Sequence, residues 1–213
     1  MSKRAGQFAR RARDFYPTPR AGALPLLRHL PRGVPYWEPC AGDGALIAHL
    51  AGRADCVVAT DLAPGAEGIH RLDAMRATAA DVDATGAEMI ITNPPWPAPG
   101  QGGAPVVGLA RHLSALRPTW MLLPWDLAAN GYFDGLAPIC PCIVPVGRVS
   151  WMENGTPGKD NAAWFLFDAR VRVAGPVVLS RTGGRTARAV HGRALRAWRA
   201  ARVGRTYTME VAA

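Results

Sequence analysis

The sequence predicts an α/β fold in which a mostly parallel sheet carries helices on both faces. Short apolar segments rich in β-branched and aromatic residues alternate along the chain with segments whose apolar residues recur at helical spacing. Strands that alternate with helices form βαβ units, and such units bind ligands at the carboxyl ends of their strands. The 213 residues are enough for one substantial core. We therefore expect one domain whose functional residues directly follow its strands.

The expected elements succeed one another in the order that this fold requires. Strands are predicted at residues 34–38, 56–60, 88–92, 119–124, 142–146 and 163–167. Helices are predicted at residues 44–51, 73–82 and 106–116. The last of these helices has one apolar face, formed by Val106, Leu109, Ala110, Leu113 and Leu116. The residues at the predicted strand ends are then Glu38, Asp61, Asn93 and Pro124-Trp125-Asp126.

Basic residues are concentrated at the two ends of the chain. Residues 1–20 hold six Lys or Arg against one Asp, and residues 170–213 hold ten Arg against one Glu. Because the whole chain has a formal net charge of +9, the middle of the chain carries about −5. This distribution predicts a basic arm at 1–13, a central domain at 14–180 and an Arg-rich tail at 181–213. Basic ends favour a polyanionic partner, although GC-rich coding would also enrich arginine.

Two features of the sequence limit the environment and the cofactors. The N-terminal segment lacks the apolar stretch of a secretory signal, and no apolar run is long enough to cross a bilayer. A cytoplasmic protein without membrane contact is therefore expected. The four cysteines, which lack the spacing of zinc ligands, are Cys40, Cys56, Cys140 and Cys142. Reduced thiols and no bound metal are expected, and the oligomeric state stays open.

A glycine-containing turn follows the first predicted strand. In the segment E-P-C-A-G-D-G, from Glu38 to Gly44, Gly42 and Gly44 permit a sharp turn and a close approach of a ligand to the backbone. The segment is neither G-x-G-x-x-G nor G-x-x-x-x-G-K-[ST], which disfavours a dinucleotide site and a P-loop. Asp61, at the end of the second strand, could accept both hydroxyls of a ribose. Asp73 could accept from an adenine amino group or could cap a helix.

A stiff turn, N-P-P-W, follows a later strand and consists of Asn93, Pro94, Pro95 and Trp96. Proline fixes φ and lacks an N–H, so neither a helix nor a sheet ladder continues through this segment. The Asn93 side-chain oxygen and the Pro94 carbonyl could accept the two N–H groups of a planar amine. Trp96 could stack on the ring that carries this amine, or could cover the core as a surface aromatic residue. Residues 97–105, rich in Gly and Pro, could close over that ring.

Taken together, these motifs resemble those of class I S-adenosylmethionine-dependent methyltransferases, in which an E-x-x-x-G-x-G loop follows the first strand and an acid follows the second. N-P-P-W resembles the signature of the amino-methyltransferases that act on adenine N6. The segment D-F-Y-P-T-P, residues 14–19, resembles the segment that precedes the domain in phage and prophage DNA N6-adenine methyltransferases. The order of the motifs matches the gamma-type arrangement. The resemblance extends over residues 14–168.

The resemblance implies a Rossmann-like fold with a mostly parallel, seven-stranded sheet. It also implies S-adenosylmethionine as cofactor and direct transfer of a methyl group to the exocyclic N6 amino group of adenine in DNA, with the target base flipped and stacked on Trp96. The acceptor site would consist of Asn93, Pro94, Pro95 and Trp96. The residues implied at the cofactor are Tyr16, Thr18, Pro19, Glu38, Pro39, Cys40, Ala41, Gly42, Gly44, Asp61, Leu62, Asp73 and Asn93.

The acceptor molecule and its contacts stay open at this point. Structured RNA or a protein glutamine amide could replace DNA, because Asn-Pro-Pro-aromatic segments serve those acceptors too. The glutamine-methylating relatives carry an extra N-terminal helical domain, for which residues 1–33 are too few. The chain could also be a nucleic-acid-binding protein that keeps the fold without the activity. DNA contacts could come from residues 124–135, from the turn at 151–161 with Lys159, or from the tail. The tail arginines that would share one helical face are Arg185, Arg188, Arg196 and Arg199.

Overall fold

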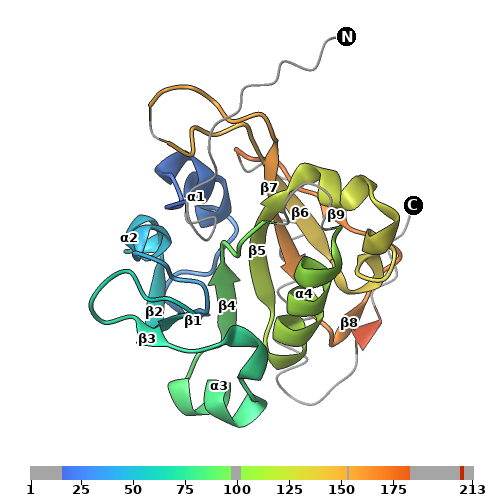
Figure 1. Cartoon of the computed structure of the whole chain (residues 1–213). Coiled ribbons are helices and arrows are strands. Elements are labelled where there is room, and N and C mark those ends of the chain that lie inside the picture. The colour runs from blue at the N-terminus through green and yellow to red at the C-terminus, as the bar shows by residue number, and fades with distance from the viewer. Residues whose placement is uncertain (1–15, 97–101, 153, 183–206, 209–213) are drawn as a thin grey trace.

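The computed structural model describes residues 16–96, 102–152, 154–182 and 207–208, which form the fold shown in Figure 1. Within these residues an eight-stranded sheet has the order β3-β2-β1-β4-β5-β7-β6-β9. Its strands are β1 (Val34–Glu38), β2 (Ala54–Asp61), β3 (His70–Arg71), β4 (Met89–Thr92), β5 (Thr119–Pro124), β6 (Cys142–Gly147), β7 (Ala162–Phe167) and β9 (Val177–Val178). A separate pair consists of β8 (Val171–Arg172) and β10 (Tyr207–Thr208).

The strand directions confirm the predicted α/β class with a mostly parallel, Rossmann-like sheet. β1 pairs in parallel with β2 and β4, and β4 pairs in parallel with β5, whereas β7 runs antiparallel between β5 and β6. The predicted count of seven strands is one too low, because the short β9 adds to β6 in the part of the chain that the structure describes. The chain runs outward from β1 through β2 to β3 and then returns to β4. The topological switch point, where open α/β sheets bind ligands, therefore lies between β1 and β4.

Helices cover both faces of the sheet, as predicted. α1 (Arg20–Leu27) and α2 (Ala45–Leu50) contact each other on one face, and α4 (Ala104–Leu116) packs on the other. Figure 1 shows α1 and α2 in the left half of the molecule and α4 in its right half, beside β5. Along β5, Trp120 enters the apolar cluster beneath α1 and α2, whereas its neighbour Met121 enters the cluster beneath α4. A strand whose side chains alternate between two apolar clusters is buried on both faces, which is typical of a central strand in a sheet covered by helices on both sides.

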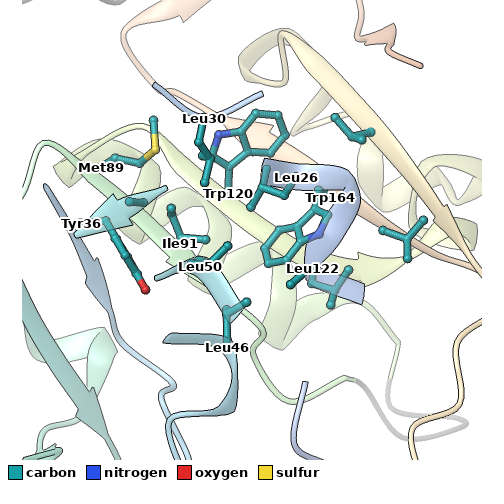
Figure 2. Close-up of a cluster of buried hydrophobic side chains, with 14 of the residues drawn as sticks. Leu26, Leu30, Tyr36, Leu46, Leu50, Met89, Ile91, Trp120, Leu122 and Trp164 are labelled. Atoms are coloured by element: carbon teal, nitrogen blue, oxygen red, sulfur yellow. The ribbon is translucent and has the colours of Figure 1, made fainter. Parts of the chain in front are cut away.

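The cluster beneath α1 attaches this helix to the sheet, and 14 of the cluster's residues are drawn in Figure 2. Trp120 from β5 and Trp164 from β7 are at most 1% exposed and are among its largest members. Trp164 Nε1 donates a hydrogen bond to the carbonyl oxygen of Gly22 in α1, with an N···O distance of 2.8 Å. Because residues 16–19 directly precede α1, this bond also limits where that segment can lie.

The helix predicted at residues 73–82 is wrong in its extent. A 3₁₀ turn, η2 (Ala74–Arg76), comes first, and α3 (Ala79–Thr85) begins only after a break. Asp73 caps η2 with its side chain, and Thr78 starts α3 with a reciprocal capping box. A capping residue has extended rather than helical backbone angles, so two caps in close succession divide the segment.

Short elements escape the patterns in the sequence. Among them are α1, β3, β9 and three 3₁₀ turns after β5, namely η3 (Trp125–Ala129), η4 (Gly131–Phe133) and η5 (Ala137–Ile139). An element of two to five residues is too short to show a hydrophobic period, and α1 contains a proline that disfavours a helix by composition.

The predicted domain boundaries stay predictions. The arm at 1–13 and most of the tail at 181–213 lie outside the described residues. Within the tail, Tyr207–Thr208 pairs in parallel with β8 and so returns to the domain. Among the described segments, none of the helices has the length and apolar character needed to cross a membrane.

Candidate functional site at the carboxyl ends of β1 and β4

Two of the predicted motifs lie side by side at the switch point of the sheet. The glycine-containing turn begins where β1 ends, at Glu38, and N-P-P-W begins directly after β4. β1 and β4 are hydrogen-bonded neighbours, with Trp37 opposite Ile90. The sheet therefore brings together two motifs whose first residues, Glu38 and Asn93, are 55 positions apart in the chain.

The glycine-containing turn is held by the carboxylate of Asp61. Gly42 and Gly44 have positive φ angles of 55° and 84°, and Gly44 is the N-cap of α2. The amide of Gly42 donates to Asp61 Oδ2 at 2.8 Å, and the amide of Ala63 donates to Oδ1 at 2.7 Å. A carboxylate oxygen can accept more than one hydrogen bond, so Asp61 can fix the turn and still accept from a ligand hydroxyl.

A second turn, which the motif analysis did not identify, packs on the first. The amide of Gly65 donates to the carbonyl oxygen of Gly42 at 2.8 Å, and a Cβ at Gly65 would lie only 3.0 Å from that oxygen. The dipeptide Pro64-Gly65 is a turn signal, but it does not show which segment the turn contacts. Leu62, at the start of this turn, is 63% exposed. An apolar side chain at this place could cover a planar ligand.

Glu38, the first residue of the glycine-containing turn, is a buried carboxyl group. It is fully buried, and its Oε1 accepts from the amide of Cys40 at 3.3 Å. No described residue donates to its Oε2 with hydrogen-bond geometry, although the Thr92 hydroxyl is close enough to affect the pKa of Glu38. Burial raises the pKa of Glu38 to about 8, against the opposite effect of the Thr92 hydroxyl and of the amides of Cys40 and Asn93. The nearby carboxylate of Asp61 raises this pKa further. Glu38 is therefore a proton-bearing group near neutral pH.

The pH dependence of stability should reveal this proton. The unfolded chain releases it near pH 4.5, whereas folded Glu38 holds it up to about pH 8. The stabilising contribution of the proton is therefore fully present below pH 4.5 and is lost as the pH rises through 8. We expect the wild type to lose stability relative to Glu38→Gln across this interval, measured by urea unfolding at several pH values. Glu67→Gln, which changes an exposed carboxylate, is the matched control, and the same pH profile in both variants would contradict the assignment.

Asn93 joins the predicted N-terminal segment to the end of β4. Its Nδ2 donates to Thr18 Oγ1 at 3.0 Å, and Thr18 is only 5% exposed. Its Oδ1 is buried and has no hydrogen-bond partner among the residues that the structure describes. A buried polar atom without a partner costs about 1–3 kcal/mol, so a water, an ion or a ligand that donates to it would be favoured. The Asn93 side chain thus offers one acceptor atom at the switch point.

Trp96 is fixed at the same edge by the neighbouring strand. Its Nε1 donates to the carbonyl oxygen of Leu122 in β5 at 3.0 Å. Its ring meets Trp151 edge to face, with centroids 5.0 Å apart and an interplanar angle of 78°. Both rings are partly buried against the core cluster beneath α1, so Trp96 does cover the core. The ring is only partly buried, and its stacking on a ligand stays a proposal.

The other residues implied at the site differ in their surroundings. Asp73 is exposed, and its Oδ1 accepts a hydrogen bond from the amide of Met75 at 3.0 Å. Asp73 therefore caps the 3₁₀ turn η2, one of the two roles that the sequence allowed. Met75, which the sequence analysis did not name, is 49% exposed. Lys159 is exposed on the turn between β6 and β7. The residues that lie at the turn after β1 or before α1 are Tyr16, Pro19, Pro39, Cys40 and Ala41. The tail residues that lie outside the described part of the chain are Arg185, Arg188, Arg196 and Arg199.

No family model and no curated protein matches the chain. Among solved structures it is similar to the methyltransferase subunit of a type I restriction-modification system from Streptococcus thermophilus, with 11% identity and a TM-score of 0.49 over 87% of this chain and 53% of that chain. It is also similar to a dimethyladenosine transferase from Plasmodium falciparum, with 12% identity and a TM-score of 0.46 over 72% of this chain and 62% of that chain. It is similar as well to the 23S rRNA methyltransferase ErmE, with 17% identity and a TM-score of 0.43 over 86% of this chain and 76% of that chain.

These similarities are too weak to add to the functional argument. The chain spans about half the length of the restriction-modification subunit, at 53%. All three identities are below 20% and all three TM-scores are below 0.5. The fold assignment therefore rests on the strand order and strand directions of the sheet.

Proposed function

We propose that the chain is an S-adenosylmethionine-dependent methyltransferase that modifies the exocyclic N6 amino group of adenine in DNA. The observation that carries the proposal is the Asn93 side chain, whose Oδ1 is buried without a partner among the described residues, while its Nδ2 is held by Thr18. An amino group that donates an N–H to this oxygen would remove the cost of leaving it unpaired. N-P-P-W, in which this asparagine lies, resembles the signature of methyltransferases that act on such an amine.

The residues around the glycine-containing turn fit the proposed cofactor. Glu38 offers a buried carboxyl oxygen to which no described residue donates with hydrogen-bond geometry, and Asp61 keeps acceptor capacity for ribose hydroxyls. Gly42 and Gly65 meet so closely that a side chain on Gly65 would press on the turn. Leu62 exposes an apolar side chain that could cover the adenine ring. When bound, S-adenosylmethionine supplies an activated methyl group on a sulfonium centre. The remaining residues proposed to line it are Tyr16, Thr18, Pro19, Pro39, Cys40, Ala41, Gly44, Asp73 and Asn93.

The acceptor residues would orient the amine. The lone pair of an exocyclic amine is delocalised into the ring, so the nitrogen is a poor nucleophile. If both N–H groups donate, one to Asn93 Oδ1 and one to the Pro94 carbonyl, a pyramidal nitrogen with a directed lone pair is favoured. Pro94 and Pro95 keep these acceptors in place, because each ring fixes its φ angle. Positioning of this kind supplies much of the rate of a direct displacement. The methylated amine is strongly acidic and can lose its proton to water without a dedicated base.

Trp96 would hold the acceptor ring. A base inside a duplex is out of reach, so the enzyme would flip it or act on single strands. Stacking on an aromatic side chain contributes about 1–3 kcal/mol, which is comparable to the cost of unstacking one base. The bond from Trp96 to the Leu122 carbonyl and the contact with Trp151 fix the indole before a base arrives. A preorganised ring loses little conformational entropy on stacking.

Most of the proposed DNA contacts lie in the Arg-rich C-terminal tail. Lys159, on the exposed turn between β6 and β7, could bind a phosphate. The same role is proposed for tail residues outside the described segments, namely Arg185, Arg188, Arg196 and Arg199. A cytoplasmic location also stays a proposal.

The decisive experiment identifies the modified nucleoside. The protein is incubated with cofactor labelled in its methyl group and, separately, with plasmid DNA, cellular RNA and a protein extract. The nucleic acids are then digested to nucleosides and the label is located. Label in N6-methyladenine from DNA supports the proposal. Label in an RNA nucleoside or in protein glutamine changes the acceptor, and no label in any fraction favours the non-enzymatic alternative.

The contact between the two turns leads to a prediction about cofactor affinity. Gly65→Ala places a Cβ 3.0 Å from the Gly42 oxygen, so the backbone of one turn has to move by a few tenths of an ångström. Strain of this kind typically costs about 1–3 kcal/mol, so we expect cofactor affinity to fall about tenfold or more, measured by calorimetry. Gly175→Ala is the control, because a Cβ there meets no atom within 4 Å. Equal cofactor affinities for the two variants would contradict the proposed cofactor site.

A further inference from the structure

An aromatic side chain after β5 is used neither by the core nor by the proposed acceptor site. Tyr132 lies in η4 and is 39% exposed. Its neighbour Phe133 is 5% exposed and meets Phe165 of β7 edge to face, with ring centroids 5.9 Å apart. Phe133 therefore anchors the turn in the core, and Tyr132 is left on the outside.

The Tyr132 ring is nevertheless held in a defined position. One side of it packs against Gly103, the N-cap of α4, so closely that a Cβ on Gly103 would overlap the ring. Gly103 has φ −88°, which any residue can adopt, so the ring and not the backbone conformation excludes a side chain there. At the other end of the turn, the Arg111 guanidinium of α4 lies against Gly135. Two contacts with one helix thus fix the turn and its exposed ring.

The ring lies at the edge of the sheet that carries the proposed acceptor site. Gly103 belongs to the connection that leads from Trp96 into α4, and η4 follows the carboxyl end of β5. The same strand supplies the Leu122 carbonyl that binds Trp96 Nε1. Figure 1 shows the yellow-green turns after β5 beside the upper end of α4. A nucleic-acid strand with one base in the acceptor site would bring its neighbouring nucleotides to this edge.

We propose that Tyr132 stacks on the base of a nucleotide adjacent to the acceptor nucleotide. The inference rests on the proposed function, because the acceptor site is what brings a strand to this edge. Every base has a π-face that an aromatic ring can cover, and such a stack contributes about 1–3 kcal/mol. Asp126 and Asp134, both exposed on the turns around Tyr132, repel phosphate. The Arg111 guanidinium at Gly135 offsets part of this repulsion, so it is the exposed aromatic ring of Tyr132 that favours a base as its partner.

The test is a double-mutant cycle on binding to single-stranded DNA. Fluorescein-labelled oligonucleotides carry one adenine, with either normal bases or an abasic position on one side of it. Their dissociation constants for the wild type and for Tyr132→Leu are measured by fluorescence anisotropy. Leucine can still pack on Gly103 but has no aromatic face. We expect the wild type to lose about 5- to 100-fold in affinity when the stacked base is removed, and Tyr132→Leu to lose much less.

Further variants separate stacking from folding. Tyr132→Phe keeps the ring and should behave as the wild type does. Gly103→Ala displaces the ring without removing it and should behave as Tyr132→Leu does, even if the latter folds poorly. Val178→Ala, which changes an exposed apolar residue on β9, is the matched control. Thermal unfolding of each variant checks that it is folded.

The outcomes distinguish this inference from the proposed function. The stacking role of Tyr132 is overturned if removal of the base lowers the affinity equally in the wild type, Tyr132→Leu and Gly103→Ala. It is also overturned if the wild type binds none of the oligonucleotides. The same proteins are assayed for methyl transfer to DNA. If methyl transfer occurs but the effects of Tyr132→Leu and of base removal on affinity are additive, only the stacking role of Tyr132 is refuted. If the two effects are not additive but no methyl transfer occurs, the stacking role is supported and the proposed methyltransferase activity is refuted.

Discussion

Asn93→Ala is expected to lower the rate of methyl transfer by about 10²- to 10³-fold, the usual cost of removing one preorganised hydrogen-bonding group from an active site. The substitution removes the Oδ1 that lacks a partner among the described residues and that is proposed to accept from the amine. Cofactor affinity should fall much less than the transfer rate, because Asn93 is only one of the residues proposed to line the cofactor, and Glu38 and Asp61 are unchanged. Single-turnover transfer with labelled cofactor gives the rate, and calorimetry gives the affinity.

Thr18→Val is the comparison that separates orientation from chemistry. Valine has nearly the shape of threonine but lacks the hydroxyl that accepts from Asn93 Nδ2. Asn93 then keeps its acceptor oxygen but loses its orientation, so we expect a loss of transfer rate that is clearly smaller than that of Asn93→Ala. A folded Asn93→Ala protein that transfers methyl groups near the wild-type rate would contradict the assignment of Asn93 to the acceptor site.

Trp164→Ala is expected to destabilise the protein by about 3–5 kcal/mol, as is typical when a large aromatic side chain is removed from a core. Trp164 is fully buried in the cluster beneath α1, as Figure 2 shows, and its indole N–H bonds to the Gly22 carbonyl. Alanine would leave both a cavity and an unpaired carbonyl oxygen. The free energy of unfolding in urea measures the effect, and an exposed change such as Val178→Ala should stay within about 0.5 kcal/mol of the wild type.

Trp164→Phe isolates the hydrogen bond between β7 and α1. Phenylalanine fills most of the space but leaves the Gly22 oxygen without its donor, at a cost of about 1–3 kcal/mol. Because Thr18 lies just before α1, a looser helix should also weaken the contact between Thr18 and Asn93. We therefore expect Trp164→Phe to slow methyl transfer as well as to lower stability. A variant as stable as the wild type would show that the bond does not hold α1 in place.

The central strands and their end residues were predictable because their signals are local. β1 and β4 are short apolar runs that are closely followed by proline, at Pro39 and at Pro94, and the apolar run of β5 itself ends on Pro124. Because alternating strands and helices imply a parallel sheet, the motifs at Glu38 and Asn93 are predicted to lie at the carboxyl ends of its strands. The helix predicted at 73–82 failed although a local signal was present, since Thr78 and Asp81 form the capping box that starts α3.

Trp96 shows where sequence patterns end. From its position after two prolines, the Trp96 side chain could be predicted either to stack on a ligand or to cover the core. The bond to Leu122 and the edge contact with Trp151 show that the indole is packed at the edge of the sheet. Neither partner could be chosen from the sequence, because both depend on which strand lies beside β4 and on how the turn before β7 folds back.

By itself the sequence determined the α/β class, the turn from Glu38 to Gly44, the acid at Asp61 and the stiff N-P-P-W segment, because composition and spacing within a few residues specify each of them. Only the tertiary structure decided the contacts on which the proposed sites depend: Asn93 with Thr18, Gly42 with Gly65, and Tyr132 with Gly103. The residues of each pair are far apart in the chain. Such pairs meet only after the strand order of the sheet is set, and the free energy that sets it comes from burial in the core rather than from local propensity.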